Sequence, residues 1–145
     1  MTKRSAEEVA RLSTEAMYAE DNVVQSHGIE IIETGPGRAV VAMTVQSQMV
    51  NGLGLCHGGF VFLLADTAFA YACNSHGRRT VAQHASVTFL APGKLGDRLI
   101  AEAIERQRGE RSGLTDVTVR NEHREAIAEF RGHSRTISGS LLAIG

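Results

Sequence analysis

Residues 58–74 constrain the fold more than any other part of this sequence. The stretch has no proline, and beyond its opening glycines it is rich in alanine, leucine and phenylalanine. This composition predicts a single helix with almost no polar face, ended by Asn74 and Ser75. A helix that is apolar all round belongs in the interior, surrounded by other elements. The rest of the chain must therefore wrap around it.

The residues after this helix change to a period of two, which is typical of strands. Their connections hold Pro92-Gly93, Gly109 and Asn121-Glu122, and such short connections predict antiparallel neighbours. Two earlier strands are expected on either side of the turn at Gly35-Pro36-Gly37. The six expected strands are 28–33, 38–45, 80–90, 98–106, 114–120 and 125–137. The pattern predicts an α+β fold in which an antiparallel sheet curls around one helix.

The N-terminus carries a separate helix signal. Ser5-Ala6-Glu7-Glu8 is a capping-box pattern, and apolar residues follow it at helical spacing, so we expect an N-terminal helical segment within residues 1–24. No stretch has linker composition, which predicts one domain over residues 1–145.

Composition excludes several functional classes. The 145 residues have a net charge of −1, without the basic excess of a nucleic-acid-binding domain. Two cysteines are too few for a disulfide framework, which indicates a reducing, cytoplasmic location. The longest apolar stretch is interrupted by Asp66-Thr67 and is shorter than the ~20 residues that cross a membrane. We expect a cytoplasmic protein that binds neither membrane nor nucleic acid.

Asp66 is the main chemical anomaly, because it lies in the middle of the most apolar helix. An unpaired carboxylate there costs several kcal/mol and has a raised pKa, as catalytic acids and bases often do. The structural alternative is a carboxylate that caps or pairs with a neighbouring group.

The segment from Asn51 to Gly59 is the second candidate feature, since it is rich in glycine and leads into the helix. The free N–H groups at a helix start can form an oxyanion hole, with Gly58 as the donor. The alternative is a flexible loop with a permissive helix start. His57 either donates to a ligand oxygen or satisfies the turn. Asn51 either orients water or substrate or makes an Asx turn.

Helix geometry links the two features. Gly58 and Asp66 are eight residues apart, which is roughly 12 Å along one helix, so they cannot serve one carbonyl in the same chain. Two antiparallel copies of the helix across a two-fold axis would bring Gly58 of one chain to Asp66 of the other. A functional role for both residues therefore implies a symmetric dimer with shared sites.

Other motifs lack the required geometry. A dinucleotide fingerprint would need glycine at His57, and no Gly-x-Ser-x-Gly elbow is present. The pairs Cys56-His57 and Cys73/His76 resemble a zinc set, but they flank a long helix, so only an intersubunit site could join them. The basic residues expected in turns either meet phosphates or are simply solvated; they are Lys94, Arg108 and Arg111.

These motifs together resemble the hotdog-fold acyl-CoA thioesterases, in particular the phenylacetate-degradation (PaaI-type) branch. The resemblance covers residues 28–137 and implies a long helix wrapped in an antiparallel sheet. The matching segments are Asn51-Gly52, Cys56-His57-Gly58-Gly59, Leu64-Ala65-Asp66-Thr67-Ala68 onward to Asn74, Phe89-Leu90-Ala91-Pro92-Gly93 and Phe130-Arg131-Gly132.

By this resemblance, Asp66 is the catalytic carboxylate and the Gly58 N–H polarises the thioester carbonyl, while Asn51 and His57 help to hold water or the carbonyl. Asp66 acts either as a general base on water or as a nucleophile. The resemblance implies sites between subunits, a dimer of dimers, and no metal or redox cofactor. Gly59, Ala70 and Ser86 are candidate substrate contacts.

The expected reaction is hydrolysis of an aromatic acyl-CoA, such as phenylacetyl-CoA or its ring-hydroxylated forms, to a free acid and CoA. Small side chains such as Ala70, one turn after Asp66, leave room for a flat acyl ring; alternatively, these alanines let two helices approach closely. A hotdog acyl-thioester dehydratase or hydratase and a non-catalytic acyl-CoA sensor remain alternatives.

Overall fold

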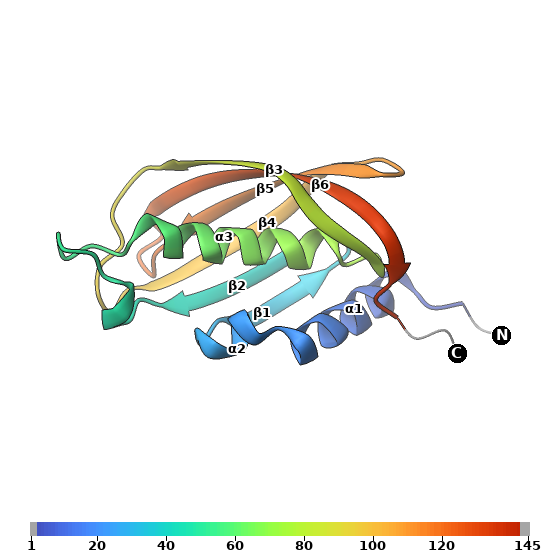
Figure 1. Cartoon of the computed structure of the whole chain (residues 1–145), viewed down its shortest axis with the longest axis horizontal. Coiled ribbons are helices and arrows are strands. Elements are labelled where there is room, and N and C mark those ends of the chain that lie inside the picture. Colours follow the sequence, from blue (N-terminus) through green and yellow to red (C-terminus); the bar gives the residue numbers. More distant parts are fainter. Residues whose placement is uncertain (1–2, 143–145) are drawn as a thin grey trace.

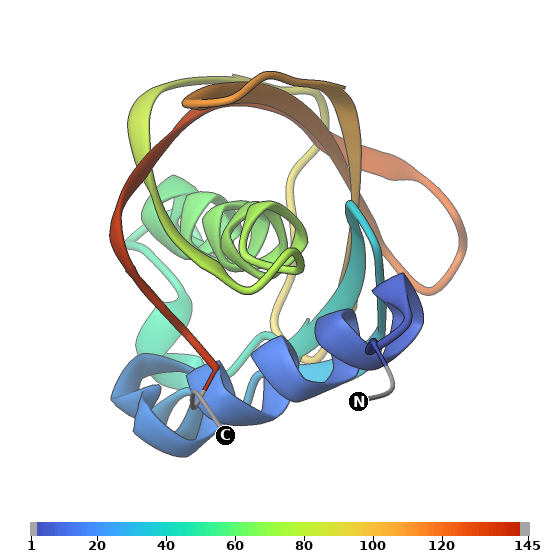
Figure 2. The same ribbon diagram turned by 90° about the vertical axis from the view of Figure 1, so that its right-hand side faces the viewer.

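The computed structural model describes residues 3–142 and shows six antiparallel strands curled around one long helix (Figures 1 and 2). The strands follow the spatial order β1-β2-β4-β5-β6-β3, so β1 and β3 are the two edges. The elements are α1 (Ala6–Glu20), α2 (Asn22–Ser26), β1 (Glu30–Gly35), β2 (Arg38–Thr44), η1 (Ser47–Met49), α3 (Gly58–Cys73), β3 (Arg78–Phe89), β4 (Arg98–Arg108), β5 (Ser112–Arg120) and β6 (Ala126–Ser140). The predicted α+β architecture is confirmed.

The central helix α3 begins and ends where the sequence predicted. His57 is its N-cap, and Asn74 is its C-cap. The Asn74 amide donates to the carbonyls of Ala70 and Thr80 at 2.9 Å each, and its Oδ1 accepts the Thr80 N–H at 2.9 Å. This buried side chain therefore fastens the end of α3 to the start of β3.

The inner face of the sheet packs on α3 through small and branched side chains. Alternate residues of the central strands are fully buried there, because successive side chains of a strand point to opposite faces. Close approach is most evident at Gly132 of β6, where a Cβ atom would lie 2.5 Å from the ring of Phe69. The buried positions of β2, β4 and β5 on this face are Ala39, Val41, Met43, Leu99, Ala101, Ala103, Thr115, Val117 and Val119.

One expectation about connectivity is wrong. The short segment after β3 does not make a hairpin with β4, because β3 pairs with β6 at the far edge of the sheet. Residues 90–97 instead cross the open end of the fold beside the loop that precedes α3. The Cys56 N–H donates to the Gly93 carbonyl at 2.8 Å, and the Val45 N–H donates to Asp97 at 2.9 Å.

The N-terminal helices cover the β1 end of the sheet (Figure 2). Ser5 caps α1 as predicted, since its side chain accepts the Glu8 N–H at 3.1 Å. The segment is also joined to the core helix, because the buried Tyr71 hydroxyl of α3 donates to Asp21 at 3.0 Å. The Asp21 side chain also accepts the Val24 N–H and so starts α2.

Candidate active site

Asn51 organises the loop that leads into α3. Its Oδ1 accepts the N–H groups of Leu53 and Leu55 at 2.9 and 3.2 Å, and its backbone N–H donates to the Leu55 carbonyl at 2.8 Å. Because Oδ1 is occupied by the turn, the Nδ2 amide is the part of this side chain left to serve a ligand: it has no hydrogen bond to residues 3–142. Asn51 thus makes the Asx turn and keeps a donor.

His57 closes the first turn of α3. The Gly59 N–H donates to its Nδ1 at 2.9 Å, so Nδ1 is the acceptor and the neutral ring carries its proton on Nε2. A Cβ on Gly59 would lie 3.1 Å from that Nδ1, which explains why glycine suits this position. His57 therefore satisfies the turn and, on the exposed side, presents an Nε2–H donor.

Gly58 has the free backbone donor. The N–H groups of Phe60 and Val61 bond to the His57 carbonyl, and that of Gly59 bonds to the His57 ring. Within residues 3–142 the Gly58 N–H has no such partner, and it stands at the positive end of the helix dipole.

A cavity of about 410 Å³ opens at this end of the helix. Gly58 and Asn51 both line it, together with the segment that follows β3. The structure therefore brings two of the expected site residues to one cavity, and places His57 directly beside them in the chain. The remaining lining residues are Leu55, Cys56, Val61, Phe89, Leu90, Ala91, Pro92 and Gly93.

Asp66 lies farther along α3, half-buried among apolar side chains. Burial raises the pKa of its carboxyl above the ordinary value of 3.8. No hydrogen bond or ion pair joins it to another residue in the described range 3–142, so it neither caps nor pairs within one chain. An unpaired carboxylate held in apolar surroundings is suited to accept a proton from water.

One stripe of α3 is not fully covered by the sheet. It contains Gly59, Phe62, Leu63, Asp66 and Ala70, which recur at helical spacing and are half-buried or exposed, whereas most other positions of the helix are buried. Ala70 therefore lies on the same face as the carboxylate. The stripe is apolar except for Asp66, so it forms an incompletely covered apolar surface on the helix.

Two of the helix aromatics are already engaged in the core. Phe69 packs on Phe130 with ring centroids 5.8 Å apart, and Tyr71 is 1% exposed and bonded to Asp21. Neither is free to stack on an acyl ring. Of the aromatic residues near Asp66, only Phe62 lies on the half-covered stripe, and it also touches Phe130 edge-on at 5.3 Å.

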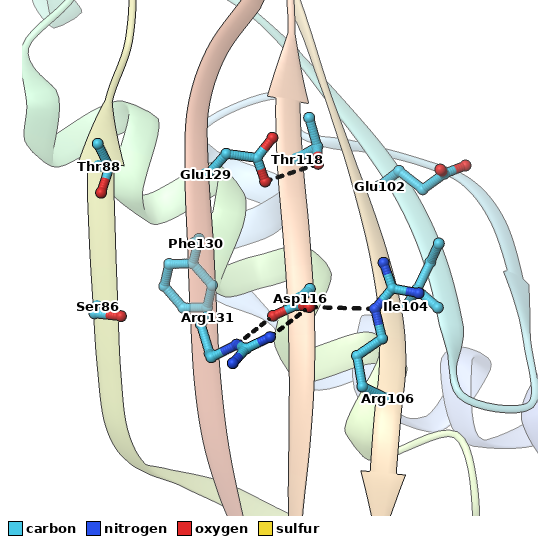
Figure 3. Close-up of a pocket in the computed structure, with 10 residues that line it drawn as sticks. All are labelled: Ser86, Thr88, Glu102, Ile104, Arg106, Asp116, Thr118, Glu129, Phe130 and Arg131. Carbon is cyan, nitrogen blue, oxygen red and sulfur yellow. Dashed lines mark hydrogen bonds and ion pairs between the residues drawn. The ribbon is translucent and has the colours of Figure 1, made fainter.

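Ser86 lies away from this arrangement, on the outer face of the sheet (Figure 3). It lines a cavity of about 320 Å³ beside an ion-pair network. Arg131 donates to both carboxylate oxygens of Asp116 at 2.6 and 2.9 Å, and Arg106 donates at 3.2 Å. These guanidinium groups, Arg131 first, lower the pKa of Asp116. Within one chain Ser86 is not brought to Asp66.

The cysteine and histidine pairs occupy opposite ends of α3, as expected. His76 pairs with Glu105 of β4 at 2.8 Å, and both cysteines are buried and free. Over residues 3–142 no cluster of three histidine, cysteine, aspartate or glutamate residues has the arrangement of a metal site.

Among the same residues, no helix has the length and hydropathy needed to cross a bilayer.

The fold and this loop–helix arrangement match a known family. The family model described as the thioesterase superfamily matches residues 53–128, which include Gly58 and Asp66. The chain belongs to the thioesterase superfamily. In sequence, it is 48% identical over 126 residues to the acyl-coenzyme A thioesterase PaaI of Escherichia coli K12, an alignment that spans 87% of this chain and 90% of that protein.

Solved structures of relatives agree with this assignment. The Escherichia coli PaaI protein from the phenylacetic acid degradation operon superimposes with a TM-score of 0.92 at 46% identity, covering 94% of this chain and 99% of that one. A Streptococcus mutans UA159 protein solved with bound acetyl CoA gives a TM-score of 0.74 at 27% identity, over 77% of this chain and 90% of that one. The hotdog fold expected from the resemblance is confirmed.

Sequence reasoning did not single out Phe89 by itself. Its ring lies over Gly58, 31 positions earlier in the chain, and a Cβ on Gly58 would be 3.0 Å from its Cζ. An exposed phenylalanine at the end of a strand carries no local signal for this contact. Only the motif Phe89-Leu90-Ala91-Pro92-Gly93 pointed to the segment, and it did so through the family resemblance.

Proposed function

We propose that this enzyme hydrolyses the thioester of an aromatic acyl-CoA, of the phenylacetyl type, in phenylacetate degradation. Water adds to the thioester carbonyl and the C–S bond breaks, giving a carboxylic acid and free CoA. One observation carries the proposal: the same helix holds a free Gly58 N–H at a cavity and, farther along, an unpaired, half-buried Asp66 carboxylate.

The residues divide the chemistry between polarisation and proton transfer. The Gly58 N–H, at the start of α3, stabilises negative charge on the carbonyl oxygen. Asn51 Nδ2 and His57 Nε2 are further donors at this end for the carbonyl or for water. Asp66 removes a proton from the attacking water, a role that its raised pKa favours because a more basic carboxylate accepts a proton more readily.

We further propose that the site forms between two chains. Gly58 and Asp66 are roughly 12 Å apart along α3, so one chain alone does not present both to one carbonyl. The half-covered stripe of α3 and the unpaired edge of β3 together offer a partner surface, since a free strand edge pairs readily with another strand. Such a dimer, and a dimer of dimers built from it, would hold two sites per pair of chains.

The proposal includes a cytoplasmic location and no metal or redox cofactor. The reaction as written needs water and no redox group. A cytoplasmic location fits the two free cysteines, both of which are buried.

The decisive experiment is an assay of free thiol released from a panel of acyl-CoAs by the purified enzyme. We expect turnover of phenylacetyl-CoA and its ring-hydroxylated forms, with palmitoyl-CoA poorer in kcat/KM. Binding without thiol release would favour an acyl-CoA sensor. Addition of water to an enoyl-CoA, without thiol release, would favour a hydratase.

Chain mixing tests the shared site. Asp66→Asn chains and Gly58→Pro chains should each be inactive, but heterodimers should regain activity because one of their two sites combines an intact Gly58 with an intact Asp66. Heterodimers that form, as shown by mass spectrometry of differently tagged chains, and yet remain inactive would contradict the arrangement.

A further inference from the structure

Phe89 lines the cavity at the start of α3 but has no part in the chemistry proposed above. It is the last residue of β3, and its side chain remains 53% exposed although it is large and apolar. Its backbone is well held, because Phe89 pairs with Ala128 in the ladder and the next N–H, that of Leu90, donates to the Ile127 carbonyl at 2.8 Å. The backbone at the base of the ring is thus fixed, while the ring itself stays partly exposed.

The tip of the ring lies directly on Gly58. A Cβ built on Gly58 would be 3.0 Å from Phe89 Cζ, 3.3 Å from Cε1 and 3.5 Å from Cε2. The ring therefore occupies the space that any larger residue at position 58 would need. Gly58 and Phe89 also line the same cavity of about 410 Å³, so the ring forms part of the cavity wall beside Gly58.

We propose that Phe89 is a positioning residue for the carbonyl-binding N–H of Gly58. The ring covers this end of the cavity, keeps bulk water away from the N–H, and directs the thioester carbonyl toward it. A hydrogen bond to developing negative charge strengthens when water is excluded, because the local dielectric falls. This inference rests on the proposed role of the Gly58 N–H.

The position of Phe89 predicts which kinetic constant it affects. The ring lies at the carbonyl end of the site and not beside Ala70, where the acyl group is expected. Its removal should therefore lower kcat for phenylacetyl-CoA and for acetyl-CoA by a similar factor, with little change in KM. A residue that bound the acyl group would instead change the ratio between the two substrates.

The test compares Phe89→Ala and Phe89→Leu with Leu95→Ala. Leu95 is a matched control because it is apolar, 60% exposed and on the segment after β3, but does not line the cavity. Loss of a whole oxyanion-hole donor costs roughly 100- to 1,000-fold in kcat, and we expect loss of its shield to cost about tenfold in Phe89→Ala and less in Phe89→Leu. Leu95→Ala should keep the wild-type kcat.

A second arm uses coupling between the two residues. Gly58→Ala should fold, because the three atoms nearest to its new methyl group all belong to the exposed Phe89 ring, but it should push the ring aside and lower kcat. In a Phe89→Ala background the same Gly58→Ala change should cost much less. Losses that simply multiply in the double variant would overturn the proposal.

A third arm is independent of activity. Amide-proton exchange at Gly58, followed by NMR, should be faster in Phe89→Ala than in the wild type and unchanged in Leu95→Ala. An unchanged exchange rate in Phe89→Ala would show that the ring shields nothing. If the wild type releases no thiol from any acyl-CoA, the proposed function fails, whereas the exchange measurement still decides whether Phe89 covers Gly58.

Discussion

Gly132→Ala is the sharpest test of how the sheet holds the helix that carries Asp66. A Cβ at this position of β6 would lie 2.5 Å from both Cδ1 and Cε1 of Phe69 and 3.0 Å from Cγ. Unstrained carbon contacts are about 3.5–4.0 Å, so strand and ring would have to separate by roughly 1 Å. Phe69 is 1% exposed and packs on Phe130, so its ring has little free space to occupy.

The expected loss of stability follows from two opposing effects. Overpacking a well-packed core costs about 1–3 kcal/mol, and the contact with several ring atoms places this case near the upper end. Replacing glycine with alanine within a strand otherwise gains about 0.5–1 kcal/mol. The net destabilisation is therefore about 2 kcal/mol, which lowers Tm by roughly 4–8 °C in a chain of this size.

Thermal and urea unfolding at one fixed protein concentration would measure the effect, because the stability of a dimer such as the one proposed above would depend on concentration. Gly109→Ala is the matched control, since its Cβ would meet only the Ser112 carbonyl at an ordinary 3.4 Å. Phe69→Leu should restore part of the stability of Gly132→Ala, although alone it leaves a void. Wild-type stability in Gly132→Ala, or purely additive effects in the double variant, would refute this packing argument.

Four further predictions concern the same helix. Asp66→Asn should keep the fold and lower turnover at least a hundredfold, the scale of losing a general base; near-normal hydrolysis would remove the assignment. Burial raises the folded-state pKa of Asp66. The contribution of this group to the free energy of unfolding is therefore greatest below the ordinary pKa of 3.8 and falls as pH rises through the raised value. Urea unfolding should show that Asp66→Asn is more stable than the wild type at pH 7 but not at pH 3. Asn74→Ala should cost about 2–4 kcal/mol because it leaves the N–H and carbonyl of Thr80 without their side-chain partner and removes one of the donors to the Ala70 carbonyl. Asn74→Asp, which keeps only the acceptor, should be little better, and a loss below about 1 kcal/mol would contradict the capping role. Ala70→Leu should narrow the kcat/KM preference for phenylacetyl-CoA over straight-chain thioesters, and an unchanged preference in a stable variant would argue that Ala70 does not line the acyl site.

The sequence by itself determined the features that depend on neighbours along the chain. The apolar composition around Asp66 predicted one buried helix, and local caps at Ser5, His57 and Asn74 set where helices begin and end. The strands were predicted to within a few residues at each end, for the same local reason: alternation and turn residues act over short distances. An acid in an apolar helix and a glycine-rich helix start were also visible without coordinates.

Only the tertiary structure decided what depends on pairing between distant residues. The place of β3 beside β6, and not beside β4, follows from a ladder that no turn sequence encodes. The outward face of Ser86 depends on a bulge between Ala82 and His84, because one extra residue in a strand exchanges its two faces. The contact of Phe89 with Gly58 arises because residues 90–97 run back past the start of α3. Periodicity specifies which residues share an element, whereas the sheet's register and curl specify which elements meet.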